Sequence, residues 1–347
     1  MRLNGIEAAR GLAAFAVVLF HMNGCAAAHA GMPVFPALGT AIHGVDFFFV
    51  LSGFIICHVH RGDIGRPAAA WDFVAKRCIR LFPVLWLVVL GTIALYTVAG
   101  RPISGPQVLT SLLLTPSRLE PLPDTVWTLR HEFVFYCAFL VLILNRRIGL
   151  GLFAGWTLAV LAQLFLAVAG RPVGGIASFF LSSYEIDFVL GAAVAAFGSR
   201  IPAGRRLLGG ALGLMIALLW LGERLGMNRT ALNDYTSVAA TAWVIVLGIG
   251  FALLVLGLLS IERELRVPRW LIELGACSYA LYLVHVPVQL ALVRAGLMLH
   301  LPAPAILAMA AIVPILVALA LHHGFERPVS RWLRARLLRS PRAAVAG

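Results

Sequence analysis

Residues 6–24 (IEAARGLAAFAVVLFHMNG) and residues 44–56 (GVDFFFVLSGFII) are apolar segments that carry a few ionisable residues, and they decide the fold. A helix needs about 20 mostly apolar residues to cross a bilayer, and similar blocks recur along the whole chain. They lie near residues 6–24, 43–60, 81–99, 127–145, 148–168, 179–197, 207–222, 237–259, 272–294 and 303–322. The pattern predicts an all-α integral membrane protein with about ten transmembrane helices.

The composition supports this fold class. The chain has 347 residues, 61% of them hydrophobic and 12% charged, with a mean hydropathy of +0.93. Soluble domains are about 45–50% apolar and about 25% charged, so disorder, a coiled coil and a water-soluble enzyme are excluded. We expect a polytopic domain over residues 1–322 and a basic cytoplasmic tail over residues 323–347. Residues 100–126 should form an interfacial or re-entrant element on the outer side, because their apolar piece is too short to cross.

The net charge of +13 comes from 28 Lys and Arg residues that lie mostly between the apolar blocks. Basic residues gather on the cytoplasmic side of membrane proteins, and a cytoplasmic N-terminus places most of them there. Both termini are therefore predicted to be cytoplasmic, with membrane lipids and not nucleic acid as the charged partner. The five Cys residues have no paired spacing, and the His residues show no ligand set, so neither a disulfide nor a metal site is predicted.

Ionisable residues inside the blocks are functional hypotheses, because each one costs about 2.5–3.5 kcal/mol at the centre of a spanning helix. They are Arg10, His21, Asp46, Glu132, Glu185, Asp187 and His285. The alternative is that they pair with one another as polar contacts between helices. One of the two acids at 185 and 187 is a candidate for binding acceptor hydroxyls. Glu326, beyond the last block, is expected to pair with the Arg-rich tail.

Depth along the helices separates these residues into two layers. The outer layer is an acid–base set: His21, Asp46 and Glu132. The inner layer is basic: Arg10, Arg77 and Arg80. Arg10 and His21 share a helix face about 16 Å apart along the axis, and Arg suits bidentate recognition of phosphate. Acyl-coenzyme A, whose long arm separates its phosphates from its thioester, fits both layers.

Further polar residues are candidates for substrate contact. Ser52 lies at mid-membrane, and Tyr136 lies one turn from Glu132. Tyr282 and His285 share one helical face with Ser278. We expect Tyr136, Tyr282 and His285 to line the acceptor or acyl tunnel, with a polar packing seam as the equal alternative for the last two.

Seven motifs follow one another along nearly the whole chain. They are EAARGLAAFAVVLFH (7–21), GVDFFFVLSGFII (44–56), RCIRLFP (77–83), VWTLRHEFVFY (126–136), FVLGAAVA (188–195), SYALYLVHVPV (278–288) and FERPVSRWL (325–333). In this order they resemble the integral-membrane acyltransferase 3 family.

The resemblance implies a bacterial inner-membrane enzyme that moves an acyl group, usually acetyl, from cytoplasmic acyl-coenzyme A to a hydroxyl. The implied acceptor is a cell-surface or lipid-linked glycan, or another hydroxylated molecule, and the implied donor is acetyl-CoA. The resemblance also implies that Arg10 and His21 are essential and that Arg77 and Arg80 associate with the donor. The Ser-Gly-Phe element maps to residues 52–54, so we group Ser52 with the donor, and the acid of the fourth span maps to Glu132.

On this view His21 is the general base that removes the proton of the acceptor hydroxyl. A carboxylate that holds its tautomer would help, and Glu132 is preferred over Asp46. Ser52 as a covalent nucleophile is disfavoured, because no nucleophile elbow surrounds it. Two other classes are open: a secondary transporter or exporter of a small anionic or sugar-derived solute, and a non-catalytic scaffold. The broken helices at matching positions that are typical of transporters do not stand out.

Overall fold

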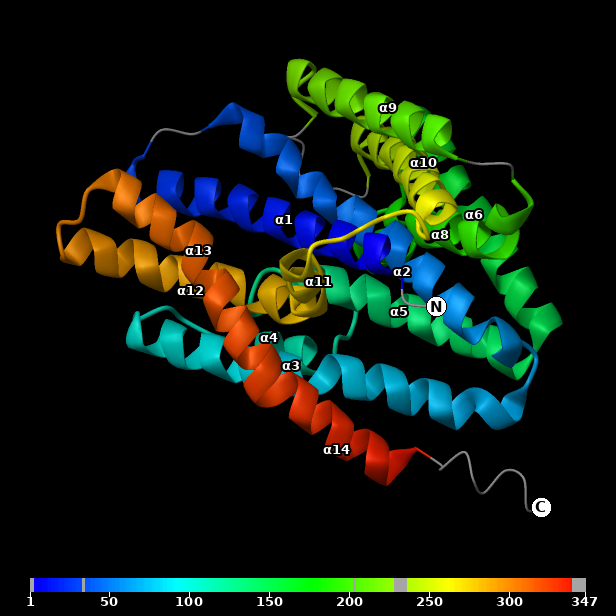
Figure 1. The fold of residues 1–347 in the computed structure, drawn as a ribbon, viewed down its shortest axis with the longest axis horizontal. Coiled ribbons are helices and arrows are strands. Elements are labelled where there is room, and N and C mark those ends of the chain that lie inside the picture. Colours follow the sequence, from blue (N-terminus) through cyan, green and yellow to red (C-terminus); the bar gives the residue numbers. More distant parts are fainter. Residues whose placement is uncertain (1–2, 33–34, 202–203, 228–235, 339–347) are drawn as a thin grey trace.

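A computed structural model describes residues 3–32, 35–201, 204–227 and 236–338. This part of the chain is helical and contains no strand. The helices are α1 (Asn4–Ala30), α2 (Gly44–His60), α3 (Ala70–Val98), α4 (Gly105–Leu112), α5 (Val126–Leu144), α6 (Arg146–Val168), α7 (Gly175–Phe180), α8 (Tyr184–Phe197), α9 (Arg205–Arg224), α10 (Val238–Ile261), α11 (Arg269–Ala276), α12 (Ser278–Met298), α13 (Ala303–Leu321) and α14 (Arg327–Leu337) (Figure 1). Short 3-10 helices are η1 (Pro36–His43), η2 (Arg61–Asp63), η3 (Pro67–Ala69) and η4 (Gly198–Arg200), and η6 (His322–Glu326) is a π-helical turn.

Ten helical segments of the described residues are long and apolar enough to cross a membrane. The predicted fold class is therefore confirmed. The peripheral helices α6 and α9 expose apolar side chains such as Phe165 and Ile216, which suits contact with lipid. The irregular stretch between α3 and α5 contains the short helix α4, and its interfacial or re-entrant position stays a prediction. The segment after α4 is held by Arg130 of α5, a buried side chain whose guanidinium donates to the carbonyl oxygens of Ser117 (3.2 Å) and Leu119 (2.9 Å).

The third spanning helix starts earlier than predicted. The expected start at residue 81 is wrong, because α3 begins at Ala70. Phe73, Ala75 and Ile79 are buried against the rest of the bundle, so this polar stretch forms a helix with one apolar face. Arg77 therefore lies inside α3 and not at its start.

The ninth block is divided at Cys277 into α11 and α12. The division accompanies a close approach between α1 and α11. A Cβ atom at Gly11 would lie 2.7 Å from the Gly275 nitrogen, and one at Gly275 would collide with the Glu7 carbonyl oxygen. Glycine at both positions lets the two backbones touch.

The last spanning helix continues past the expected boundary at 322–323. The π-helical turn η6 joins α13 to α14 without a break, and the helical segment runs from Ala303 to Leu337 (Figure 1). The described part of the basic tail is thus helical. It packs against α3, where the Trp71 indole donates to the Leu337 carbonyl at 3.2 Å.

Helices α2 and α8 pack extensively against each other. A Cβ atom at Gly53 would collide with the Phe188 carbonyl, and one at Gly191 would collide with the Val50 carbonyl. The glycine of the Ser-Gly-Phe element is therefore required by close helix packing. Ser52, the preceding residue, lies on a different face of α2 from the one that packs against α8.

Candidate active site

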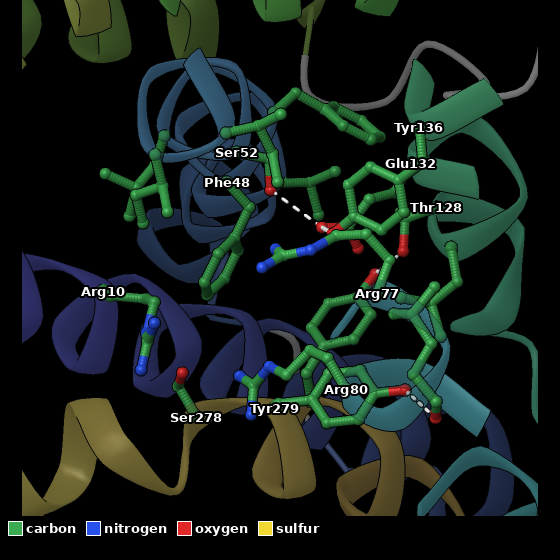
Figure 2. A pocket seen from close by; sticks show the side chains of 18 residues that line it. Arg10, Phe48, Ser52, Arg77, Arg80, Thr128, Glu132, Tyr136, Ser278 and Tyr279 are labelled. Carbon is green, nitrogen blue, oxygen red and sulfur yellow. Dashed lines mark hydrogen bonds between the residues drawn. The ribbon is translucent and has the colours of Figure 1, made fainter. Parts of the chain in front are cut away.

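A cavity of about 140 Å³ lies between α1, α2, α3, α5 and α12 (Figure 2). Its walls combine apolar side chains with charged and hydroxyl groups. The polar lining residues are Arg10, Ser52, Arg77, Arg80, Thr128, Glu132, Tyr136, Ser278, Tyr279 and Tyr282. The structure thus brings most of the predicted site residues to one cavity, whereas His21, Asp46 and His285 do not line it.

Arg77 presents a guanidinium to this cavity without a hydrogen-bonding partner. Among the described residues it forms neither a hydrogen bond nor an ion pair, and its Nε atom is buried. Its Cζ atom lies 5.7 Å from the centre of the Tyr136 ring. A buried Nε–H that lacks a hydrogen bond is costly, and an anion in the cavity would satisfy it.

Arg80 is held from two sides. Its guanidinium forms an ion pair with Glu326 of η6 and lies 4.7 Å from the centre of the Tyr279 ring. The second carboxylate oxygen of Glu326 lies 2.8 Å from His322 Nδ1. The expected pairing of Glu326 with the Arg-rich tail is therefore wrong, because the π-helical turn directs this carboxylate toward α3.

Arg10 reaches the cavity from α1. Its guanidinium donates to the Gly275 carbonyl oxygen from Nε (3.1 Å) and from one terminal nitrogen (2.6 Å), and it pairs with Glu7 at 2.6 Å. The Gly275 carbonyl is at the C-terminal end of α11, where helix carbonyls lack intrahelical partners and attract cations. Figure 2 shows Arg10, Arg77 and Arg80 around the same space.

Glu132 accepts two hydrogen bonds inside the cavity. The Ser52 hydroxyl donates to its Oε1 atom at 3.0 Å, and the Tyr136 hydroxyl donates to the same atom at 2.5 Å. The Ser52–Glu132 bond joins α2 to α5 (Figure 2). Ser52 therefore has its hydroxyl engaged by a carboxylate, and no His contacts it among the described residues.

His21 contacts His285 and not a carboxylate. His21 Nδ1 lies 3.0 Å from the Val17 carbonyl oxygen and 3.2 Å from His285 Nε2. His285 is completely buried on α12. The two rings have centroids 4.9 Å apart.

His21, Asp46 and Glu132, the residues of the predicted acid–base layer, have separate hydrogen-bond partners and do not bond to one another. Asp46 is buried at the start of α2, with Oδ2 3.1 Å from His43 Nδ1. Glu132 is turned into the cavity by its two hydroxyl donors. Equal depth had suggested contact, but the three side chains point from their helices in different directions. Their catalytic roles stay predictions.

The two acids of α8 lie away from the cavity. Glu185 Oε1 lies 2.9 Å from His131 Nδ1, and both side chains are buried. Asp187 is fully buried, and its carboxylate oxygens have no hydrogen-bond partner among the described residues. Neither residue lines the cavity, so an acceptor-binding role for them gains no support.

Tyr282 stands between the cavity and the histidine pair. Its hydroxyl shares a hydrogen bond with the Thr128 hydroxyl at 2.9 Å, and its ring contacts Phe48, with centroids 5.9 Å apart. Its ring centroid is also 5.8 Å from that of His285. The cavity thus extends from the arginines to Tyr282, with His285 immediately beyond.

The comparison with known families decides between the classes considered above. A sequence profile described as an acyltransferase domain matches residues 3–323, nearly the whole chain. The chain belongs to the acyltransferase 3 family. It is also 30% identical over 323 residues to the exopolysaccharide production protein ExoZ of Rhizobium meliloti (strain 1021), covering 84% of this chain and 90% of that protein. No solved structure matches the chain.

The acyltransferase is therefore a multi-pass membrane protein, and its family favours group transfer over transport.

Several residues that line the cavity were not predicted from the sequence, among them Phe48, Thr128 and Tyr279. Thr128, Glu132 and Tyr136 recur every four residues and so share one face of α5, a signal that could have found Thr128. The contact of Tyr279 with Arg80 depends on how α12 packs against α3 and has no local sequence signal.

Proposed function

We propose that this acyltransferase moves an acetyl group from cytoplasmic acetyl-CoA to a hydroxyl of a cell-surface or lipid-linked glycan, at the bacterial inner membrane. The name of its relative ExoZ, an exopolysaccharide production protein, supports a glycan acceptor. The family supports acyl transfer. The unpartnered guanidinium of Arg77, next to Arg10 and Arg80, is the observation that carries the choice of an anionic donor.

The size of the cavity suits one end of this donor. Sites for whole ligands measure about 300–1,000 Å³, whereas an apolar cavity of about 150 Å³ holds a benzene-sized molecule. The cavity of about 140 Å³ can therefore hold the acyl thioester end and a phosphate group against the arginines, but not the adenosine of the donor. We place the phosphates at the arginine side, with Ser52 and Tyr136 along the arm and the acyl carbonyl toward Tyr282.

The chemistry is direct transfer in a ternary complex. The acceptor oxygen attacks the thioester carbonyl carbon while His21 takes the hydroxyl proton. The carbon–oxygen bond forms, the carbon–sulfur bond breaks, and the departing thiolate receives the proton from His21. Glu132, with the Ser52 and Tyr136 hydroxyls on it, balances the positive charge of the arginines beside the thioester. Asp46 bonds to His43 and does not line the cavity, so we assign it no direct part in the transfer.

The test uses membranes that contain the full-length enzyme and acetyl-CoA labelled in the acetyl group. Label should appear in extracted surface glycan as an ester that mild alkali releases. Arg77→Ala should lower activity at least about tenfold, because a hydrogen bond to a charged group contributes about 1.5–3 kcal/mol. Arg147→Ala is the matched control, since this Arg of α6 is exposed and does not line the cavity.

Two outcomes would contradict the proposal. If Arg77→Ala leaves the donor KM and kcat unchanged, Arg77 does not bind the anionic donor. Uptake of unmodified solute into sealed vesicles, with no labelled ester in any glycan fraction, would favour transport.

A further inference from the structure

His285 and His21 form an imidazole pair between α12 and α1. Their contact joins Nε2 of His285 to Nδ1 of His21 at 3.2 Å. Among the described residues, no carboxylate contacts either ring. The position that a carboxylate takes in a hydrolase triad is therefore taken by a second imidazole.

Backbone carbonyls define which nitrogens carry the protons. His285 Nδ1 lies 3.0 Å from the Leu281 carbonyl oxygen, and His21 Nδ1 lies 3.0 Å from the Val17 carbonyl oxygen. A carbonyl oxygen only accepts hydrogen bonds, so each Nδ1 must carry a hydrogen. In the neutral rings both Nε2 atoms then have lone pairs. The single Nδ1–H of His21 is then shared between the Val17 carbonyl oxygen and His285 Nε2 in a three-centre hydrogen bond, which leaves His21 Nε2 as the basic atom.

We propose that His285 is a positioning residue for His21 and does not itself touch substrate. This inference rests on the proposed function, in which His21 removes the hydroxyl proton. When that proton arrives at His21 Nε2, the ring becomes an imidazolium and its Nδ1–H becomes a stronger donor. His285 Nε2 accepts this bond throughout and so stabilises the His21 cation. The cation lasts until His21 Nε2 gives the proton to the thiolate sulfur.

The surroundings explain why a neutral acceptor serves here. His285 is completely buried in a helix that crosses the membrane, where an unpaired carboxylate would be costly. A neutral imidazole supplies a lone pair without that cost. The Leu281 carbonyl, one turn back on the same helix, keeps the lone pair directed at His21.

The kinetic test compares two substitutions at position 285 with a matched control. His285→Leu removes the acceptor, whereas the amide oxygen of His285→Gln can accept a hydrogen bond near the place of Nε2. The control is Gln289→Leu, one turn further along α12, where the buried amide donates to the Val18 (2.9 Å) and Ala310 (3.1 Å) carbonyl oxygens. It removes a comparable contact between α12 and α1 without touching His21.

A positioned base contributes about 10²–10⁴-fold to a rate, and we expect His285→Leu to lower kcat by about 10–100-fold with the donor KM unchanged. His285→Gln should recover most of the loss, and Gln289→Leu should keep kcat even if its melting temperature falls. Equal kcat losses in the Leu and Gln variants, or in Gln289→Leu, would overturn the positioning role.

A spectroscopic readout on the wild-type protein separates this inference from the proposed function. In protein labelled with ¹⁵N-histidine, His21 and His285 should each show a protonated Nδ1 and an unprotonated Nε2 at neutral pH. The signals are assigned by difference from the His21→Gln and His285→Gln proteins. A His21 protonated at Nε2 would overturn the inference even if acyl transfer is active. Absence of acyl transfer with the expected signals would contradict the proposed function alone.

Discussion

Arg80 on α3 and Glu326 in the π-helical turn after α13 form an ion pair that ties the third spanning helix to the last one. π-Helical turns occur often at functional sites. Here the turn directs one carboxylate at a cavity-lining arginine, with His322 on its other oxygen. The last spanning segment is thereby linked to the cavity through Arg80.

Glu326→Ala should raise the KM for acetyl-CoA about tenfold, equivalent to about 1.4 kcal/mol, because Arg80 would lose the group that holds it. Glu326→Gln should raise KM less, since it keeps an acceptor for Arg80. Steady-state kinetics in membranes measures both. Glu264→Ala is the control, because its ion pair with Arg205 is exposed and such pairs contribute little. A KM that is unchanged in Glu326→Ala would show that Arg80 does not need the pair.

Ser52→Ala should retain activity, with a loss of no more than about tenfold, because the structure uses the hydroxyl as a hydrogen-bond donor to Glu132. A covalent nucleophile would instead give complete loss of turnover. Mass spectrometry of the enzyme after brief mixing with acetyl-CoA provides the second measurement. An acetyl ester on Ser52 would establish the acyl-enzyme route and refute direct transfer.

Gly53→Ala should destabilise the protein by at least about 1–3 kcal/mol, the usual cost of overpacking, since the new Cβ atom would meet the Phe188 carbonyl. The melting temperature of the detergent-solubilised protein measures this. Gly91→Ala is the matched control in α3, because a Cβ atom there has nothing within 4 Å. Equal melting temperatures for both variants would mean that α2 and α8 are not in close contact.

Cys277, between α11 and α12, should resist thiol reagents in the folded enzyme. Burial raises the pKa of its thiol to about 11, and the side chain is inaccessible. The thiolate is the reactive form, so at pH 8 only about one thiol in a thousand is ionised. Maleimide labelling followed by peptide mass analysis should find Cys277 unmodified at pH 8 and modified after denaturation. Rapid labelling of the folded protein at pH 8 would contradict this burial.

The pattern of apolar and polar residues was sufficient to predict the fold class and much of the cavity lining. Apolar blocks of spanning length predict the membrane class, and the polar and charged residues inside them include Arg10, Ser52 and Glu132, all of which line the cavity. Helix ends were less predictable, since Phe73 and Ile79 extend α3 through a charged stretch by burying one face.

What the sequence by itself determined is which residues lie inside spanning helices and at roughly what depth, because hydrophobic length and helical rise depend only on local sequence. Only the tertiary structure decided which of them touch. Glu132 meets Ser52 and Tyr136, His21 meets His285, and Glu326 meets Arg80, because side-chain partners depend on the rotation of each helix against its neighbours. That rotation is decided by close contacts such as those of Gly53 and Gly275, which involve residues distant along the chain.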